Sequence, residues 1–457
     1  MNDPIWLVIK HELRVRQCNL QFCFSCYFGQ SLRQPMTRQE RIILFLLAAL
    51  NFTHILDFII MVPLSIYLIP EFKITAFQFS TLVASYSISA FFSGICAALL
   101  IDRHDRKKAL LVAYVGFLIG TFACGISSSY FTLLMSRIVA GTFGGILGAQ
   151  VLAIVADIFS YERRGRAMGA VMSAFAVASV IGIPLSLFLT NLFKSNWHIP
   201  FLAIAGIGIL LIPFMIKHLP SLKEHIDENL STSIFNNLTT IMKVPIPRSA
   251  LFFSALFMFG HFLVIPFIPS YLEFNKGFTK FQIPLILLCG GIASFAAAII
   301  FGKYADKKGK LPVFTWSVII SLFLVWILTN MPSMNIQLAL LFFAVLFIVV
   351  TSRIVVAHAM ISGVVPQHQR GSFMSVNGSM QHLGQGLASL VAGIIIKTDR
   401  DTHQLSNYNW VGYLSIAVLI ASVIIGNKIF KSVDKPATSS EDDQSLKSEE
   451  LALDIAE

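Results

Sequence analysis

The sequence predicts an all-α membrane protein with twelve transmembrane helices in two pseudo-symmetric bundles of six. Three observations support this prediction. Of the 457 residues, 56% are apolar and 13% are charged, whereas about 25% of the residues of a soluble protein are charged. The apolar residues gather in twelve runs of roughly the 20 residues that cross a bilayer as a helix. Motifs of the first half also recur in the second half at a nearly constant distance.

The apolar runs are continuous and do not alternate with polar residues, so they predict helices and not the strands of a membrane barrel. The first six expected spans cover residues 42–69, 79–101, 109–126, 131–158, 167–193 and 198–216. The second six cover residues 249–272, 281–302, 312–330, 336–362, 372–397 and 408–430. The longest polar connection between spans separates the first group from the second.

These boundaries divide the chain into five expected parts. They are a cytoplasmic N-terminal extension (1–40), an N-terminal bundle (41–216), a cytoplasmic central loop (217–248), a C-terminal bundle (249–431) and an acidic, disordered cytoplasmic tail (432–457). Residues 1–35 are too polar for the apolar core of a signal peptide. Since Met36 precedes a short polar stretch and then an apolar run, we expect residues 1–35 to be an extension or the result of a misassigned initiator.

The 34 Lys and Arg residues are unequally distributed between alternate loops. If both termini are cytoplasmic, 26 lie in cytoplasmic loops and tails and six in outer loops, while Arg137 and Arg353 lie within spans. This asymmetry follows the positive-inside rule and explains the net charge of +10. A nucleic-acid surface would need one contiguous basic face. We therefore expect cytoplasmic termini and no nucleic-acid partner.

Two landmarks of the first half recur in the second. The segment 98–107 resembles the segment 302–310, which lies 204 positions further along the chain. The segment 164–168 resembles the segment 370–374, at a distance of 206 positions. Nearly equal distances between separate landmarks predict a duplicated six-helix unit, and such repeats typically enclose a site near the middle of the bilayer.

Several spans and loops carry recognisable motifs. The eighth span is followed by Gly302-x-x-Ala305-Asp306-Lys-x-Gly309-Lys310, and the second by a variant that keeps Asp102, Arg103, Arg106 and Lys107 but has Ala98 and Asp105 in place of glycines. The spans contain Leu56-Asp57, Arg137-Ile-Val-Ala-Gly141 and Gly182-Ile-Pro184. Through these motifs the chain from Met36 to Lys431 resembles a member of the major facilitator superfamily, and Asp57 resembles the embedded aspartate of its drug:proton antiporter branch. The last motif departs from the antiporter pattern, since Ile183 separates its glycine from its proline.

Asp57 is the only one of the 24 acidic residues deep within an expected span. Keeping a carboxylate at such a depth costs about 2.5–3.5 kcal/mol, so it indicates function. A carboxyl group whose surroundings alternate between apolar burial and a nearby cation can take up a proton on one side and release it on the other. We expect Asp57 to couple protons to transport and Arg137, a permanent cation, to modulate it. The glycines beside Arg137 should allow close helix packing; they are Gly141, Gly144, Gly145 and Gly148.

Other polar residues within spans are candidates for contact with a substrate. His54 lies one helical turn before Asp57, and His261 is the position that the repeat relates to Asp57, so an acid and an imidazole are expected to face each other across the cavity. For each histidine, a neutral hydrogen-bonded core role explains the sequence about as well. Arg353 and His358 are weaker candidates. A polar stripe on one helix face faces either the cavity or another helix; it consists of Asn377, Gln381 and Gln385.

The cationic loops are expected to clasp neighbouring helix ends. The family resemblance implies that Asp102 and Asp306 each lie at a helix N-terminus, where a carboxylate meets free N–H groups. Arg106 is expected to pair with Asp157, and Gly302 and Gly309 belong to the same motif. Such a clasp would set the balance between inward- and outward-facing states. The alternative is that these charges only fix the topology.

Together these features predict a secondary active transporter, with proton-coupled efflux of a small organic or amphipathic compound as the leading hypothesis. The alternatives are a proton symporter that imports a sugar or amino acid and, with less support, a non-transporting membrane receptor. No paired carboxylates, metal-ligand cluster or phosphate-binding loop indicates an enzyme, a cofactor, a metal or an ATP-driven pump. The expected partners are a small-molecule substrate, protons and the lipid bilayer. We expect a monomer in a bacterial inner membrane.

Overall fold

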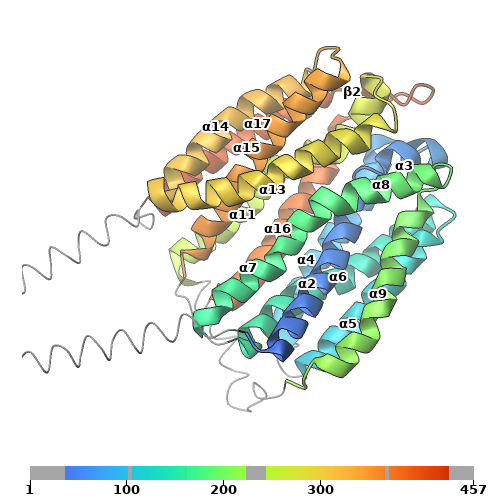
Figure 1. Ribbon diagram of the computed structural model, residues 1–457. Coiled ribbons are helices and arrows are strands. Elements are labelled where there is room, and N and C mark those ends of the chain that lie inside the picture. The colour runs from blue at the N-terminus through green and yellow to red at the C-terminus, as the bar shows by residue number, and fades with distance from the viewer. Residues whose placement is uncertain (1–35, 101–104, 160, 223–242, 366–369, 432–457) are drawn as a thin grey trace, which may run out of the picture.

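The computed structural model describes residues 36–100, 105–159, 161–222, 243–365 and 370–431, and the helices run side by side through the molecule (Figure 1). The expectations for the N-terminal extension up to residue 35, for Asp102 and for the tail from residue 432 lie outside the described residues. The side on which the first helix, α2 (Arg38–Ile60), begins and the last, α17 (Tyr408–Phe430), ends is called the terminal side here. The opposite side is called the distal side, and it carries α3 (Ser65–Phe72) and the hairpin of β1 (Lys397–Thr398) and β2 (Leu405–Ser406).

The first half of the chain forms six helical spans, two of which are interrupted. Its elements are α2 (Arg38–Ile60), α3 (Ser65–Phe72), α4 (Ala76–Leu100), α5 (Arg106–Gly125), α6 (Tyr130–Ile158), α7 (Tyr161–Val177), the π-helical turn η2 (Ala178–Gly182), α8 (Ile183–Leu192) and α9 (His198–His218). A turn joins α2 to α3, and η2 joins α7 to α8, so each of these pairs forms one broken span. In η2 the helix widens next to Pro184, which cannot donate a backbone hydrogen bond.

The second half repeats this order. Its elements are α11 (Pro245–Phe262), η3 (Ile265–Phe267), α12 (Ile268–Ser270), η4 (Tyr271–Asn275), α13 (Gln282–Lys308), α14 (Lys310–Thr329), α15 (Ile336–Ser362), α16 (Arg370–Ile395), β1 (Lys397–Thr398), β2 (Leu405–Ser406) and α17 (Tyr408–Phe430). The strands pair antiparallel, with Lys397 opposite Ser406. The helices α5 and α14 have the same length of 20 residues and begin 204 positions apart, as the repeat predicts.

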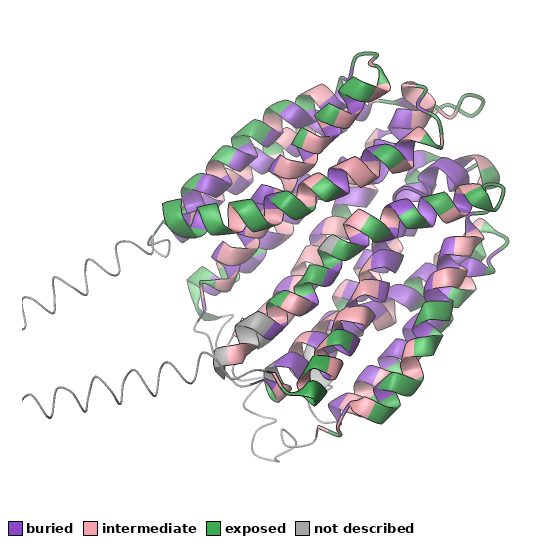
Figure 2. Cartoon of the chain, viewed as in Figure 1, coloured by how far each residue is buried: buried purple, intermediate pink, exposed green. Residues whose placement is uncertain are grey.

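Among the described residues, eleven helical segments are long and apolar enough to cross a membrane. The remaining predicted span, the eleventh along the chain (372–397), corresponds to α16, which has 26 residues but carries the polar stripe. Exposed residues cover the outer faces of α9, α13 and α14 (Figure 2), and large apolar side chains such as Leu210, Trp316 and Phe323 stand among them. An apolar exterior over a helical core is what a bilayer requires, so the predicted all-α membrane fold with two helical bundles is confirmed.

Buried apolar residues pack into three clusters. The cluster at the distal side contains residues of both halves, for example Phe79 and Phe267. The other two clusters lie toward the terminal side, and their buried members belong to the first half alone or to the second half alone. Only Phe262 packs against all three clusters among the described residues. The halves therefore share a core at the distal side and have separate cores at the terminal side.

Polar contacts also join the halves at the distal side. Ser270 Oγ donates to Ser65 Oγ at 2.7 Å, and Ser270 lies one position beyond the repeat-related counterpart of Ser65. Asn191 Nδ2 donates to the carbonyl of Lys280 at 3.0 Å, while Lys280 Nζ lies 4.7 Å from the centre of the Tyr67 ring. These contacts must break for the distal side to open.

A seam of small residues joins α4 to α16. A Cβ atom on Gly393 would lie 3.0 Å from the Cα atom of Phe77, and one on Gly386 would lie 2.8 Å from Cγ1 of Ile88. Gly94 of α4 faces Ser379 of α16 nearer the terminal side. Since such distances exclude any side chain beyond hydrogen, the glycines set the spacing of these two helices.

The substitution Gly393→Ala is expected to destabilise the protein by about 1–3 kcal/mol, because the added methyl group overpacks the seam against the backbone of α4. Thermal unfolding of the purified protein in detergent measures the effect as a lower Tm. Gly206→Ala in α9 is the matched control, because nothing lies within 4 Å of the added Cβ atom there. Equal melting temperatures for the two variants would contradict the role of Gly393 in the seam.

Candidate functional site

An ion pair lies inside the first bundle, between α2 and α6. Arg137 Nη1 donates to Asp57 Oδ2 at 2.9 Å and to the backbone carbonyl of Asp57 at 3.2 Å. Both side chains are 0% exposed. Asp57 Oδ1 and Arg137 Nε and Nη2 have no hydrogen-bond partner among the described residues. The two residues selected from the sequence for proton coupling are thus in direct contact, with hydrogen-bonding capacity left over.

Tyr86 of α4 covers this ion pair. The Arg137 guanidinium carbon lies 4.4 Å from the centre of the Tyr86 ring, a cation–π contact in a desolvated setting. A Cβ atom on Gly144 would lie 3.0 Å from Cζ of Tyr86, and one on Gly141 would lie 2.7 Å from Cα of Tyr86. Gly141 thus makes room for the backbone of Tyr86 and Gly144 for its ring, so both glycines serve a residue that the sequence did not single out.

His54 lies close to the ion pair and is nearly buried, at 7% exposure. Neither ring nitrogen of His54 has a hydrogen-bond partner within the described part of the chain. Its ring centre lies 6.3 Å from that of Tyr86 and 6.0 Å from that of Phe117. The sequence left open that His54 is a neutral core histidine with its hydrogen bonds satisfied. The structure does not show this, because both ring nitrogens remain available to another partner.

The second bundle contains a different polar group. Arg353 of α15 donates from Nη2 to Nδ1 of His261 in α11 at 3.0 Å and from Nη1 to Oγ of Ser321 in α14 at 2.7 Å. Its guanidinium carbon lies 5.7 Å from the centre of the Phe257 ring. No carboxylate of a described residue lies within ion-pair distance of Arg353, which is 2% exposed. The counterpart of the Asp57 site is thus a cation bound to an imidazole.

The expectation that Asp57 and His261 face each other across the cavity is wrong. Each of these side chains contacts an arginine of its own bundle. The residues that meet between the bundles are their next neighbours, Phe58 and Phe262, with ring centres 5.9 Å apart. Consecutive side chains on a helix point about 100° apart, so a shift of one position exchanges a polar contact within a bundle for an apolar contact between bundles.

The three residues of the polar stripe of α16 differ in their contacts. Gln381 Nε2 donates to Ser254 Oγ of α11 at 3.1 Å and lies 3.4 Å from Nε2 of His358 in α15, so it follows the interhelical alternative. Gln385 Oε1 lies 3.1 Å from Nδ1 of His382 on its own helix. Asn377 is 1% exposed, and its amide has no partner among the described residues.

His382 is a site residue that the sequence reasoning missed. Its ring centre lies 5.9 Å from that of Phe58, so it reaches from α16 to the first bundle. The available signal was its place directly after Gln381, on the helix that carries the polar stripe. His382 was missed because the polar stripe was defined only by residues four positions apart.

At the terminal side the structure contains the ion pair that the sequence predicts, but its helix caps differ from the predicted ones. Arg106 Nε lies 2.8 Å from Asp157 Oδ2, so the expected pairing is present. The cap of α5 is Asp105, whose carboxylate accepts from the backbone of Lys107 at 3.0 Å and from Ser221 Oγ at 2.6 Å. The residue interpreted as a departure from the motif therefore performs the capping.

Asp306 is not at a helix N-terminus, and that expectation is wrong. It lies exposed in the last turn of α13, because α13 continues to Lys308 before the chain turns. The residue before α14 is Gly309, at a φ of 92° that suits glycine. Gly302 lies within α13, where an added Cβ atom would meet only Cγ1 of Val355 at 4.0 Å. Gly309, and not Asp306, occupies the position equivalent to Asp105.

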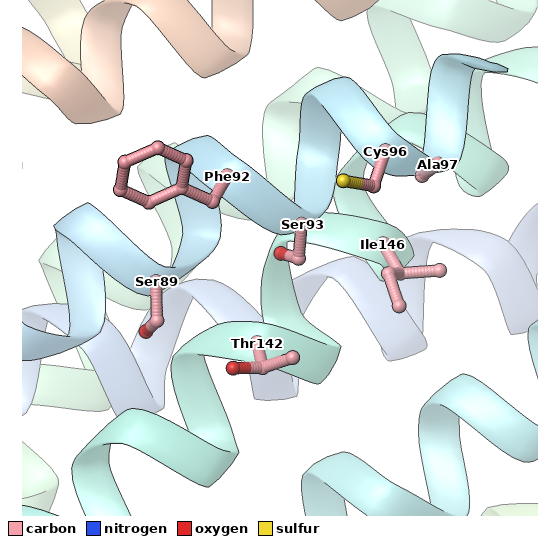
Figure 3. A pocket seen from close by; sticks show the side chains of 7 residues that line it. All are labelled: Ser89, Phe92, Ser93, Cys96, Ala97, Thr142 and Ile146. Atoms are coloured by element: carbon pink, nitrogen blue, oxygen red, sulfur yellow. The ribbon is translucent and has the colours of Figure 1, made fainter.

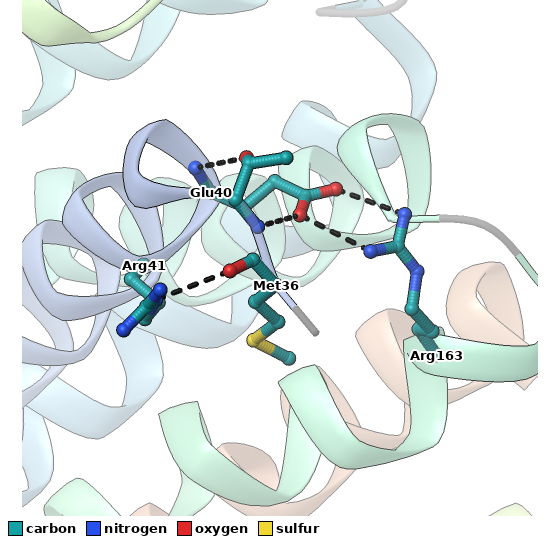
Figure 4. A network of polar contacts seen from close by, with 5 residues as sticks. Met36, Glu40, Arg41 and Arg163 are labelled. Carbon is teal, nitrogen blue, oxygen red and sulfur yellow. Dashed lines mark hydrogen bonds and ion pairs between the residues drawn. The ribbon is translucent and has the colours of Figure 1, made fainter. Parts of the chain in front are cut away.

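A further ion pair at the terminal side was not expected (Figure 4). Both carboxylate oxygens of Glu40 accept from Arg163 of α7, at 2.9 and 3.1 Å. Glu40 also accepts from the backbone of Thr37, whose hydroxyl in turn accepts from the backbone of Glu40, a capping box at the start of α2. This arrangement ties the first span to the fifth.

A groove of about 480 Å³ lies between α4 and α6 (Figure 3). It is lined by Ser89, Phe92, Ser93, Cys96, Ala97, Thr142 and Ile146. Phe92 is 62% exposed, so the groove faces outward. It contains no charged side chain and does not contact the Asp57–Arg137 pair.

Comparison with known proteins adds to this geometry. The family model of the Major Facilitator Superfamily matches residues 46–352 and 250–453. The chain is 21% identical over 368 residues to the uncharacterized MFS-type transporter YceJ of Bacillus subtilis, covering 80% of this chain and 92% of that protein. It is 30% identical over 148 residues to Multidrug resistance protein 3 of Bacillus subtilis, covering 32% of this chain and 28% of that protein.

A solved structure shares the fold. It is a bacterial homolog of the human lysosomal transporter Spinster in an inward-facing, unoccupied conformation, with a TM-score of 0.68 and 14% identity. The match covers 87% of this chain and 98% of that one.

Removing one partner of the Asp57–Arg137 pair is expected to destabilise the protein by about 3–5 kcal/mol, because the other charge is then buried without compensation. The double variant Asp57→Asn/Arg137→Gln is expected to lose less than the sum of Asp57→Asn and Arg137→Gln, since it buries no net charge. Unfolding of the purified variants in detergent measures the cycle. Additive losses would show that the two groups are not coupled.

Proposed function

The chain belongs to the Major Facilitator Superfamily, and we propose that it exports a small organic or amphipathic compound by proton-coupled alternating access. It is an integral membrane protein of a family of transporters, which are not enzymes. The observation that supports proton coupling is the Asp57–Arg137 pair, fully enclosed within a membrane-embedded bundle. The partial match to a multidrug resistance protein agrees with membership of the drug:proton antiporter branch.

In this proposal the ion pair has two states. With Asp57 ionised, its attraction to Arg137 holds α2 against α6. Protonation of Asp57 removes this attraction and leaves Arg137 under the Tyr86 ring with its remaining donors free. Because α2 leads directly into α3, a change in the position of α2 would be transmitted to the contact between Ser65 and Ser270 at the distal side. Proton uptake would thereby be linked to opening of the distal side.

The distribution of contacts supports alternating access. The bundles share one core at the distal side and have separate cores at the terminal side. This arrangement corresponds to a state open toward the terminal side. From the positive-inside charge distribution we infer that the terminal side is the cytoplasmic side and that both termini are cytoplasmic. We propose a bacterial inner membrane as the location. A monomer suffices, since one chain supplies both bundles.

The remaining sequence-predicted residues take supporting places in this proposal. His54 and the α16 residues Asn377, Gln381 and Gln385 lie on helices that meet between the bundles. The Arg106–Asp157 pair at the terminal side acts as a conformational clasp. A proton symporter that imports a sugar or amino acid would use the same ion pair, and it differs only in the direction of the substrate relative to the proton.

Reconstitution into proteoliposomes with an imposed pH gradient tests the function. A panel of aromatic carboxylates, amines and sugars is added one compound at a time, and an internal pH dye reports proton movement. We expect at least one compound to move opposite to the protons, and Asp57→Asn to abolish this coupled flux. Asp306→Asn, which removes an exposed carboxylate, is the matched control and should retain it.

Co-movement of substrate and protons would replace the antiporter with the symporter. Full coupled flux in Asp57→Asn, or no proton movement with any compound, would contradict the proposed mechanism. Folding of each variant is checked by its melting temperature before reconstitution.

A further inference from the structure

We propose that the transported compound carries an anionic group, a carboxylate on an aromatic or apolar body, and that His261 binds this group with Arg353 behind it. This inference rests on the proposed transport function and names the substrate class. It is carried by the charge balance of the embedded residues and by the hydrogen-bond geometry of His261.

The described interior of the two bundles has an excess of positive charge. Asp57 and Arg137 neutralise each other. Arg353 is 2% exposed, and among the described residues it contacts an imidazole, a hydroxyl and an aromatic ring, none of which carries a negative charge. A buried cation without an anion is costly. An anionic ligand would supply the missing charge, whereas a cationic one would be repelled.

The contact with Arg353 determines which nitrogen of His261 carries the proton. A guanidinium group donates hydrogen bonds and accepts none, so Nδ1 of His261 must be the acceptor at 3.0 Å. The proton of the neutral ring is then on Nε2. Within the described residues, Nε2 donates to no acceptor. The adjacent cation polarises this N–H group, and charge-assisted donors bind carboxylates well.

The surroundings of His261 indicate what the rest of the ligand is like. His261 lies at the end of α11, and its ring centre is 5.3 Å from that of Phe262. Phe262 faces Phe58 of the first bundle at 5.9 Å and packs against all three apolar clusters. The donor therefore stands beside the aromatic contact at which the bundles meet. An aromatic or apolar body fits this wall, and the neighbouring N–H fits a carboxylate.

Three probes of nearly the same shape test the inference: naphthoate, naphthamide and naphthamidine, which are anionic, neutral and cationic near neutral pH. Each is titrated into the purified full-length protein in detergent, and the melting temperature is followed. We expect a saturable rise with naphthoate and none with the other two. A rise of equal size with the amide, a larger rise with the amidine, or no saturable rise with naphthoate would overturn the proposal.

Substitutions then locate the site. Arg353→Gln and His261→Ala are expected to weaken naphthoate binding by about tenfold or more, because the first removes the compensating cation and the second removes the hydrogen bond to the charged carboxylate. Arg353→Lys keeps the cation, so it should still prefer the carboxylate over the amide and the amidine, with weaker binding. This variant replaces Arg353→Gln in the test if Arg353→Gln fails to fold. His261→Gln should retain part of the affinity, because its amide N–H can replace the Nε2–H donor. Unchanged binding in both His261→Ala and Arg353→Lys would place the anion elsewhere and overturn the assignment.

The binding assay uses no pH gradient, so its outcome does not depend on proton coupling. Selective naphthoate binding together with failed pH-driven flux would leave the substrate class standing and remove the coupling mechanism. Coupled flux of amines or sugars without naphthoate binding would do the reverse.

Discussion

The enclosed ion pair between Asp57 and Arg137 is the constraint on which the first bundle depends. A charge inside a bilayer is tolerated only with a partner, so the pair fixes the position of α2 against α6. Its enclosure requires Tyr86, and the approach of Tyr86 requires glycine at positions 141 and 144 of α6. The ion pair, the Tyr86 ring and the α6 glycines therefore depend on one another. A change in any of them would expose a charge to solvent or leave it buried without a partner.

The two bundles share a duplicated architecture but differ in their embedded chemistry. The first bundle has the carboxylate of Asp57 near the end of α2, the second has His261 near the end of α11, and the arginine of each bundle binds that residue. One bundle is thereby internally neutral, and the other keeps a positive charge. Duplication supplies two equivalent scaffolds, and divergence at one helical position assigns different ligands to them: in our proposals, a proton to the first and an anionic group to the second.

Contacts between the bundles explain how such a molecule can change shape without losing its fold. Each bundle has its own core toward the terminal side, so separation there leaves the helices packed. At the distal side, Ser65–Ser270 and the shared apolar cluster hold the bundles together. In the glycine seam of α4 and α16, few side chains would have to change conformation when the helices move, because most contacts are between backbones and small groups. A rocking motion of two preformed units is consistent with these contacts.

The sequence by itself determined the helical spans, the duplication and the identity of the embedded charges, because hydropathy and motif spacing are local properties of the chain. It also predicted the Arg106–Asp157 pair, which joins the loop motif after the second span to the end of the fourth span. Only the tertiary structure decided which groups meet. It directed Asp57 and His261 each toward an arginine of its own bundle, brought His382 to Phe58, joined Glu40 to Arg163, and placed the α5 cap on Asp105. These outcomes depend on helix rotation and on where each helix ends, and a shift of one residue changes the direction of a side chain by about 100°.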